Sequence, residues 1–250
     1  MLISVSSLKR IWNVNPKGVL HVGAHTGEES EAYVSYGWSP VIWVEANPEV
    51  LPQLAERISI PPDRIINCVA WNKSGDVLDF HIMSASQSSS LLALAEHAIE
   101  YPNIQEAKLI QVTTTRLDEV LDDKDSFDFA SFDVQGAEGN AIRGLGERVQ
   151  DLKYIYTEVN RRELYQGCTK VEELDSLLGG FGFKRATTRW ILRKGWGDAL
   201  YIRKNQPPKN LLQHIFALWS WVRFYSRQMI TICATIFRHF YRKASKSNKG

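Results

Sequence analysis

The feature that most constrains this fold is a pair of apolar runs, the first ending in a glycine turn and the second in a carboxylate. The first run and its turn read Val19-Leu20-His21-Val22-Gly23-Ala24-His25-Thr26-Gly27, and the second run, Val41 to Val44, is followed by Glu45. A strand, a glycine turn that opens a helix, and a second strand ending in an acid are how an α/β sheet holds a nucleoside. We therefore expect Glu45 to bind two ribose hydroxyls.

The glycines of the turn indicate which nucleoside-containing ligand fits. A dinucleotide fingerprint reads GxGxxG, whereas this turn has only Gly23 and Gly27 and no middle glycine to admit a pyrophosphate. The small zwitterionic tail of S-adenosylmethionine needs no such glycine, so the turn favours a methyl donor over NAD. The alternative is a tight turn without a ligand, and Glu45, about 20 residues on, argues against it.

Short apolar runs alternate with helical patterns between residues 17 and 204, which is typical of βαβ units and a mostly parallel sheet. The predicted strands are 18–23, 41–46, 64–70, 77–83, 108–114, 127–134, 153–159, 182–189 and 198–204. The predicted helices are 27–37, 48–58, 116–122, 137–145 and 170–179. The connection between the last two strands, around Arg193 to Gly197, is too short for a helical crossover, so we expect these strands to be antiparallel. Such a closing hairpin is typical of methyltransferase sheets rather than dehydrogenase sheets.

Five sequence blocks, in this order and spacing, resemble the FkbM family of S-adenosylmethionine-dependent methyltransferases over about residues 17–204. They are the Gly23–Gly27 turn, Glu45-Ala46-Asn47-Pro48, Ser88-Ser89-Ser90-Leu91, Thr115-Arg116-Leu117-Asp118-Glu119, and the strand end Asp133-Val134-Gln135-Gly136-Ala137-Glu138. The resemblance implies a class I, Rossmann-like methyltransferase fold with a seven-stranded, mostly parallel sheet and a terminal antiparallel hairpin. It also implies S-adenosyl-L-methionine as cofactor and methylation of a hydroxyl, often on a sugar or another natural product.

Two motifs depart from the family pattern, at three positions. Many relatives begin the first motif with an acidic residue, where this chain has His21. The usual KxDxEG pattern appears here with Ser131 and Gln135, which removes a pair of charges. The expected contact of Glu45 with the ribose is therefore better supported than the expected contacts with the methionine tail of the donor.

Asp133 is the first candidate for a catalytic base, because an alcohol must lose a proton during methyl transfer. Glu138 is the second catalytic candidate. The alternatives are that Asp133 caps the following helix and that Glu138 only occupies its first turn, where negative charge is favourable. The residues expected to contact the donor are Gly23, Ala24, His25, Gly27, Glu45, Ala46, Asn47, Val69, Ala70 and Asp133. Those expected to contact the acceptor are Ser89, Gln135, Glu158 and Asn160.

We expect loops around 84–107 and 160–170 to shape the acceptor pocket. His81 and His97 fall in less patterned segments, and we interpret both as structural or solvated. The chemistry requires no metal, and no metal site is predicted. Cys68, Cys168 and Cys233 are odd in number and widely spaced, which argues against a disulfide framework and a zinc site. No signal-peptide pattern precedes Asn15, so we expect a cytoplasmic protein.

The net charge of +2 conceals a strong asymmetry. Residues 205–250 carry eight Lys and Arg and no Asp or Glu, whereas residues 1–204 carry 22 basic and 28 acidic residues. After Pro207-Pro208, residues 209–242 form a basic amphipathic helical pattern, interrupted in its apolar run by Arg223 and Arg227. This pattern predicts peripheral binding to an anionic membrane at its inner face, or packing on the body or a second copy; spanning and nucleic-acid binding are disfavoured.

The expected organisation is a helical lead-in over 1–16, a methyltransferase domain over 17–204, a linker over 205–208 and the basic helical tail over 209–250. The leading hypothesis is an S-adenosylmethionine-dependent O-methyltransferase acting by in-line displacement on a hydroxyl of a sugar, glycolipid or other metabolite. One alternative is a non-catalytic, membrane-associated scaffold that has kept the sheet. An NAD-dependent oxidoreductase is the other, disfavoured by the missing middle glycine and by the closing hairpin.

Overall fold

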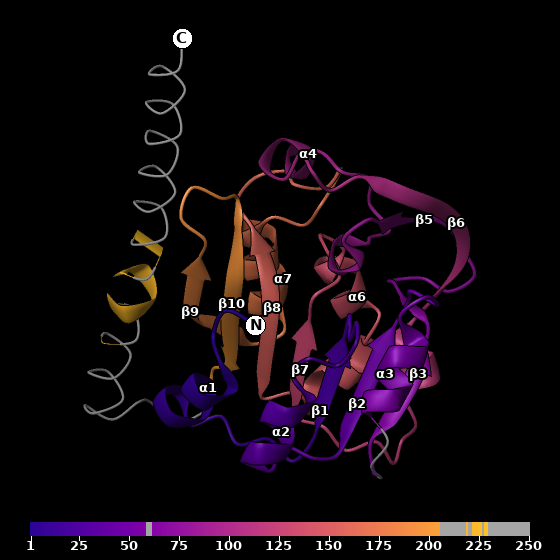
Figure 1. Cartoon of the computed structure of the whole chain (residues 1–250). Coiled ribbons are helices and arrows are strands. Elements are labelled where there is room, and N and C mark those ends of the chain that lie inside the picture. Colours follow the sequence, from indigo (N-terminus) through magenta and orange to yellow (C-terminus); the bar gives the residue numbers. More distant parts are fainter. Residues whose placement is uncertain (59–61, 206–218, 220–221, 227, 230–250) are drawn as a thin grey trace.

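Seven strands form one sheet in the order β3-β2-β1-β7-β8-β10-β9 in a computed structural model that describes residues 1–58, 62–205, 219, 222–226 and 228–229 (Figure 1). Strands β3, β2, β1, β7 and β8 are parallel, and β10 runs antiparallel to both β8 and β9. The predicted sheet with its closing hairpin is thus confirmed. The bounds are β1 (Val19–Val22), β2 (Val41–Glu45), β3 (Arg64–Asn67), β7 (Phe129–Phe132), β8 (Tyr154–Asn160), β9 (Phe183–Trp190) and β10 (Trp196–Arg203).

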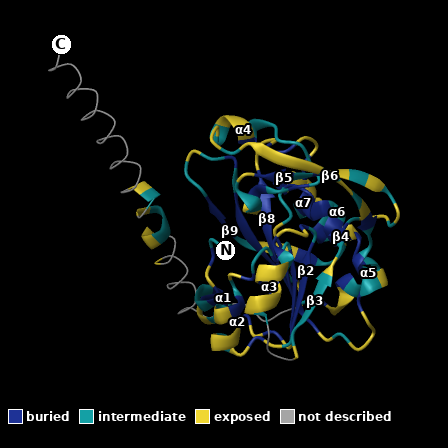
Figure 2. Ribbon diagram, turned by 45° about the vertical axis from the view of Figure 1, so that its right-hand side comes forward, coloured by how far each residue is buried: buried dark blue, intermediate teal, exposed yellow. Residues whose placement is uncertain are grey.

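The central strands are covered on both faces, which is why they read as continuous apolar runs. Every residue of β1, β2, β7 and β8 is buried (Figure 2). On one face Leu8 and Leu54 pack in a cluster with Trp43, and on the other Leu117 and Leu174 pack in a second cluster. Helices therefore hold both faces of the sheet.

The predicted helices are all present; four of them are shorter than the sequence pattern indicated, and the last is shifted by one residue. They are α2 (Ser30–Tyr36), α3 (Leu51–Arg57), α5 (Leu117–Val120), α6 (Glu138–Arg143) and α7 (Val171–Gly180), together with α1 (Val5–Trp12) in the predicted lead-in. Helix α4 (Glu96–Glu100) and the short 3-10 helices η1 (Ser86–Ser88) and η2 (Gly146–Asp151) were not predicted. The lead-in packs into the body, because Val5 and Leu8 of α1 belong to the buried cluster that contains Phe129.

A second sheet of three strands stands beside the first in the order β4-β6-β5. Its members are β4 (Val69–Ala70), β5 (Val77–Met83) and β6 (Glu106–Thr115). The prediction of one strand over 64–70 was therefore wrong. The Asn67 side chain donates to the Glu45 carbonyl at 2.8 Å where β3 ends, and Val69 then pairs with Thr114 in the second sheet.

Most of the predicted linker and tail helix lies outside the described residues. Of that tail, residues 222–226 and 228–229 are helical. Within the described part of the chain, no helix has the length and apolarity needed to cross a membrane.

Candidate active site

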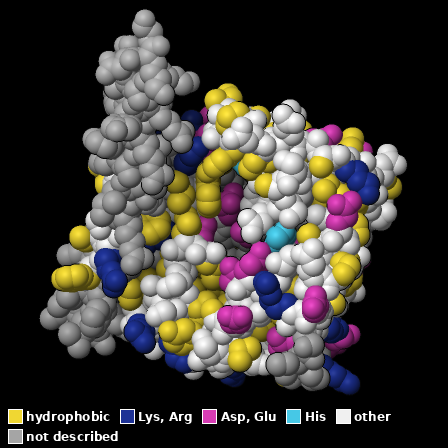
Figure 3. All heavy atoms as spheres, in the orientation of Figure 1, with side chains coloured by type: hydrophobic (Ala, Val, Ile, Leu, Met, Phe, Trp, Pro, Cys, Tyr) yellow, Lys and Arg dark blue, Asp and Glu magenta, His cyan; other side chains and the backbone are white. Residues whose placement is uncertain are grey.

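A cavity of about 450 Å³ opens where β1, β2 and β7 end. Asp and Glu side chains gather in a hollow on this face of the molecule (Figure 3). The opposite wall comes from Phe80 to Ile104 and from Leu164, Tyr165 and Trp196. The loops expected to shape the acceptor pocket therefore do border the cavity. The predicted site residues that line it are Gly23, Ala24, His25, Glu45, Ala46, Val69, Ala70, Ser89, Asp133, Gln135 and Glu158, whereas Gly27, Asn47, Glu138 and Asn160 lie outside its lining.

Glu45 ends β2 and ties together the loops that follow β1 and β2. One carboxylate oxygen accepts from the Asn47 amide at 2.6 Å and the other from the His25 amide at 2.7 Å. Burial raises the pKa of Glu45, and the two amides partly offset that rise by stabilising its charge. Because each carboxylate oxygen has two lone pairs, both oxygens retain acceptor capacity. Two adjacent ribose hydroxyls fit this arrangement.

The glycine turn after β1 is required by packing as well as by any ligand. Gly23 has φ +83°, and a Cβ there would lie 1.8 Å from the Asp133 carbonyl oxygen. Gly27 has φ +72°, and its Cβ would meet the Leu54 side chain of α3 at 3.0 Å. Gly23 thus lets β1 and β7 end close together, and Gly27 lets α3 pack against the turn.

His25 joins the turn to the opposite wall. It has φ +48°, and its ring nitrogens lie 2.7 Å from Glu28 Oε1 and 2.8 Å from Ser86 Oγ. Burial alone would raise the pKa of Glu28, but the hydrogen bond to His25 helps to lower that pKa to about 2. Gln87 donates to the same oxygen at 3.2 Å. His25 therefore holds η1 over the donor side of the cavity.

His21, one of the departures from the family pattern, is a buried part of the cavity wall. Its ring stacks on Trp43 at 5.0 Å, and its Nδ1 lies 3.1 Å from the Tyr33 hydroxyl. Burial lowers the pKa of His21, so the ring is neutral near pH 7. A neutral imidazole thus occupies the position where the family pattern led us to expect an acid.

Asp133 follows β7 and is open to the cavity while protein surrounds it. Although the side chain is solvent-accessible through the cavity, desolvation by the surrounding protein and the nearby Asp198 carboxylate raise the pKa of Asp133 to about 6. Gln135 Nε2 donates to Asp133 Oδ1 at 2.6 Å. Above pH 6 the side chain is therefore an ionised carboxylate of unusual basicity, as a proton acceptor requires.

Glu138 lies outside the cavity, contrary to the expectation that it meets the acceptor. It is fully buried, and its Oε1 accepts from the Val134 and Gly136 amides, both at 3.1 Å. Burial raises its pKa to about 7. Glu138 thus holds the turn between β7 and α6, the alternative weighed in the sequence. Asn160 is buried beneath the cavity and donates to Glu158 at 3.4 Å.

Gln135 links two acids at the cavity floor. It has φ +54°, and its Nε2 donates to Asp133 and, at 3.3 Å, to Glu158 Oε2. The Tyr165 hydroxyl donates to its Oε1, and the Ser90 hydroxyl donates to its carbonyl at 2.8 Å. Such a strained, fully held residue is typical of a functional site.

Glu158 on β8 lines the cavity, and its carboxyl group has a raised proton affinity. Burial and then the neighbouring acids Asp133 and Glu138 raise its pKa well above the usual range. Its carboxyl group is therefore able both to donate and to accept hydrogen bonds. Ser89 also lines the cavity, and its hydroxyl accepts from the Met83 amide at 3.1 Å.

Sequence reasoning missed Asp198 of β10, which lies directly across the ladder from Glu158. Asp198 is 6% exposed, and its Oδ2 accepts from the Leu2 amide at 2.6 Å and from the Tyr156 hydroxyl. An acid inside a largely apolar strand was the available signal, and only the register of β10 against β8 shows which acid it faces.

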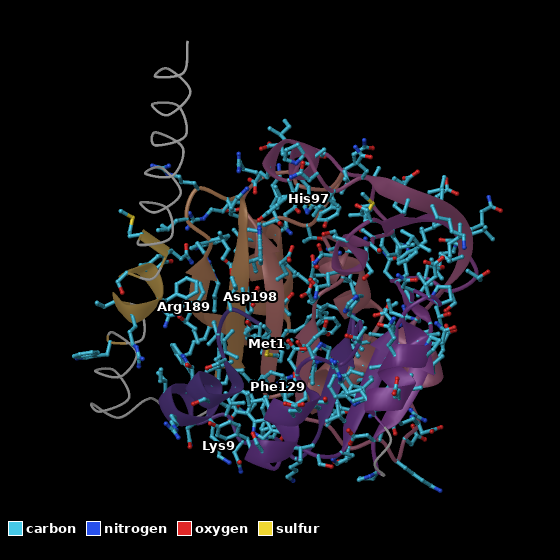
Figure 4. The ribbon with its side chains drawn as sticks, viewed as in Figure 1. Met1, Lys9, His97, Phe129, Arg189 and Asp198 are labelled. Carbon is cyan, nitrogen blue, oxygen red and sulfur yellow. The ribbon has the colours of Figure 1, made fainter. Side chains whose placement is uncertain are left out.

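His97 was interpreted as structural or solvated, and it lines the cavity from α4 (Figure 4). The ring is 6% exposed and lies between the rings of Tyr101 and Tyr165, at 4.8 and 5.2 Å. Burial lowers its pKa, and its Nδ1 has no hydrogen-bond partner among the described residues. Trp196 Nε1 donates to the Tyr101 hydroxyl at 2.9 Å and completes an aromatic wall. No sequence pattern predicted this wall, because α4 was not predicted.

Comparisons with known proteins agree with this geometry. A family described as "Methyltransferase FkbM domain" matches residues 21–185. A relative named 2-O-methyltransferase NoeI, from Sinorhizobium fredii, is 27% identical over 174 residues, which cover 65% of this chain and 71% of the relative.

Solved structures with a similar fold share little sequence with this chain. A ribosomal protein L11 methylase from Lactobacillus delbrueckii subsp. bulgaricus is 14% identical, with a TM-score of 0.43 over 81% of this chain and 78% of that one. A magnesium protoporphyrin IX methyltransferase from Synechocystis PCC 6803, solved with bound S-adenosylmethionine, is 10% identical, with a TM-score of 0.42 over 74% and 69%.

Proposed function

Because this chain belongs to the FkbM methyltransferase family and uses S-adenosylmethionine as methyl donor, we propose that it methylates a hydroxyl of a neutral sugar or of a glycolipid carrying one. The fold is that of a class I methyltransferase. The observation that carries the proposal is Asp133, a basic carboxylate open to the cavity beside the glycine turn. The relative that is a 2-O-methyltransferase supports oxygen as the accepting atom.

The donor side of the cavity is built for an adenosine. Glu45 is placed to accept from both ribose hydroxyls, and its retained acceptor capacity fits that role. Val69 and Ala70 offer a flat apolar surface on the side of the cavity where the base would lie. The donor supplies a methyl group on a sulfonium, whose leaving group is already activated. The protein therefore has to align the acceptor and remove one proton.

Proton removal falls to Asp133 in this mechanism. Its pKa of about 6 makes it a stronger base than an ordinary aspartate and still leaves it mostly ionised near pH 7. Gln135 fixes the orientation of the carboxylate through the 2.6 Å hydrogen bond. Burial raises the pKa of Glu158, so in this mechanism its carboxyl group donates to an acceptor oxygen rather than competing for the proton.

The acceptor side favours an uncharged polyol. Carboxyl groups of Asp133, Glu158 and Asp198 present hydrogen-bonding oxygens, while Tyr101 and Trp196 present apolar ring surface. Few polar groups converging within an aromatic wall are typical of small-molecule sites. An anionic acceptor would meet like charge from Asp133 and is disfavoured.

A screen with labelled S-adenosylmethionine tests the proposal. Neutral oligosaccharides and glycolipids should yield O-methyl products, identified by mass spectrometry after hydrolysis, and uronic acids or sugar phosphates of the same skeleton should yield at least about tenfold less. Calorimetry with S-adenosylhomocysteine serves as the check on donor binding. No heat with S-adenosylhomocysteine would support the non-catalytic scaffold, and methylation of nitrogen or carbon alone would contradict hydroxyl transfer.

A further inference from the structure

The described part of the basic tail lies beside β9 at the edge of the main sheet (Figure 1). We call residues 219, 222–226 and 228–229 the tail segment. Its helical residues present two different faces, one toward the body and one toward solvent. The tail as a whole, residues 205–250, carries eight basic and no acidic residues.

The inward face of the tail segment is docked by specific contacts. The Leu192 amide donates to Gln228 Oε1 at 2.7 Å, and the Trp190 amide donates to the Tyr225 hydroxyl at 3.4 Å. The Arg189 guanidinium, labelled in Figure 4, lies 5.4 Å from the centre of the Phe224 ring. These contacts use backbone groups of β9 and of the loop after it, so the segment has a fixed side toward the body.

The outward face carries an apolar stripe that the body leaves uncovered. Trp219 is 68% exposed, Val222 is 61% exposed and Met229 is 52% exposed. Val222 follows Trp219 by three residues and Met229 follows Val222 by seven, spacings that place the three side chains on one side of a helix. Arg223, also exposed, borders the stripe. Docking on β9 therefore does not account for these apolar residues.

We propose that this outward stripe of Trp219, Val222 and Met229 binds an anionic lipid surface, with the inward face anchoring the enzyme's body. A helix with apolar residues including Trp on one side, basic residues beside them and no acids is the pattern of helices that lie in a membrane interface. The excess of positive charge in the tail supplies the attraction to anionic lipid.

A second copy of the chain fits the stripe less well. Three side chains of this size bury on the order of 500 Å² when fully covered, whereas a stable interface between copies takes roughly 800 Å² from each partner. Lipid needs no matching shape, and the stripe is flanked by a cation that a membrane of opposite charge attracts. The inference stands apart from the proposed methyl transfer, because it rests on the far side of β9 from the residues of the cavity.

Vesicle co-sedimentation of the full chain tests the proposal. Vesicles of phosphatidylcholine with about a third phosphatidylglycerol should bind the protein at least about tenfold more strongly than phosphatidylcholine alone, and salt should weaken this binding. The double variant Val222→Asp and Met229→Asp should lose most of it, again by about tenfold or more. Arg223→Glu should reduce binding to the anionic vesicles only.

The matched control is the double variant Val34→Asp and Val77→Asp, because these residues are 67% and 60% exposed on the body. It should bind anionic vesicles as the unmodified chain does. All variants should retain the thermal midpoint and S-adenosylhomocysteine affinity, which confirms folding. Equal sedimentation of the stripe variant and the unmodified chain overturns the proposal. So does light scattering that shows a dimer which the stripe variant converts to a monomer.

Discussion

At the scale of single residues, the site divides its two tasks between carboxylates in different surroundings. Glu45 accepts hydrogen bonds from two backbone amides, which stabilise its charge. The proton affinity of Asp133 is raised by desolvation and by the nearby Asp198 carboxylate. The same functional group therefore serves as a hydrogen-bond acceptor at one strand end and as a base at another. Substitution at each position should separate binding from chemistry.

Replacing Glu45 by Ala should weaken S-adenosylhomocysteine binding by about 100-fold, because the hydrogen bonds from the two ribose hydroxyls to the charged carboxylate are lost. Calorimetry measures this change directly. The matched control is Glu49→Ala, since Glu49 pairs with Lys108 on the surface, and its affinity should stay within twofold of the unmodified chain's. Equal affinities for the two variants would remove Glu45 from the donor site.

Replacing Asp133 by Asn should lower kcat by about 10²- to 10⁴-fold, because the amide cannot take the acceptor proton. For the unmodified enzyme, kcat/KM should fall as pH drops through about 6, where Asp133 becomes protonated, and the variant's residual rate should lack this limb. The exposed Asp79→Asn is the control. Loss of S-adenosylhomocysteine affinity with kcat retained would instead make Asp133 a donor contact.

At the scale of elements, tight approaches between strand ends decide where the ligand groups lie. The end of β1 meets the end of β7 at Gly23, and Asp198 of β10 faces Glu158 of β8. Neither approach follows from the secondary structure of one element taken by itself. Both depend on which strands become neighbours.

Gly23→Ala should destabilise the protein by more than about 3 kcal/mol, because its Cβ would overlap the Asp133 backbone and has no flexible neighbour to displace. Gly75→Ala is the control, since Gly75 has a similar φ of +86° with nothing within 4 Å of the added Cβ. That substitution should cost only about 1 kcal/mol of backbone strain. Urea unfolding compares the two, and equal losses would mean that the close approach is relaxed.

The helices and strands that follow from the hydrophobic periodicity and from the length of the connections could be predicted. The contacts between residues that depend on how strands pair in three dimensions could not. The buried strands and the closing hairpin follow from apolar runs and a short connection. The split at Cys68 does not, because it depends on Asn67 bonding to the end of β2. Glu45 and Asp133 were predicted from strand ends, whereas Asp198 needed the register of β10 against β8 and His97 needed a helix of only five residues.

At the scale of the whole molecule, acids whose pKa values are raised by folding should make the stability pH-dependent. The pKa of Glu138 is raised to about 7 and that of Asp133 to about 6, while burial raises that of Glu158 as well. Their pKa values are higher in the folded than in the unfolded state, so the folded state binds more protons. Stability is then greatest at low pH within this window and falls as pH rises from about 4.5 through 7.

Between pH 5 and pH 8 the free energy of unfolding should therefore fall by on the order of 2 kcal/mol. Glu138→Gln should flatten this slope, because the amide does not titrate. The exposed Glu147→Gln should leave the slope unchanged. Urea unfolding across the range gives the slopes, and the same slope in Glu138→Gln and the unmodified chain would contradict the assignment.

The hydrogen bond between His25 and Ser86 has a consequence for the order of events in turnover. Glu45 holds the His25 amide while the His25 ring holds η1, so the adenosine-binding loop and the wall facing the acceptor are mechanically joined. A ligand that orders the adenosine-binding loop also favours the position of the acceptor-side wall that binds the acceptor, and such coupling is reciprocal. Each substrate should thus tighten binding of the other by the same factor, and exchange of His25 for Ala should turn synergistic binding into independent binding.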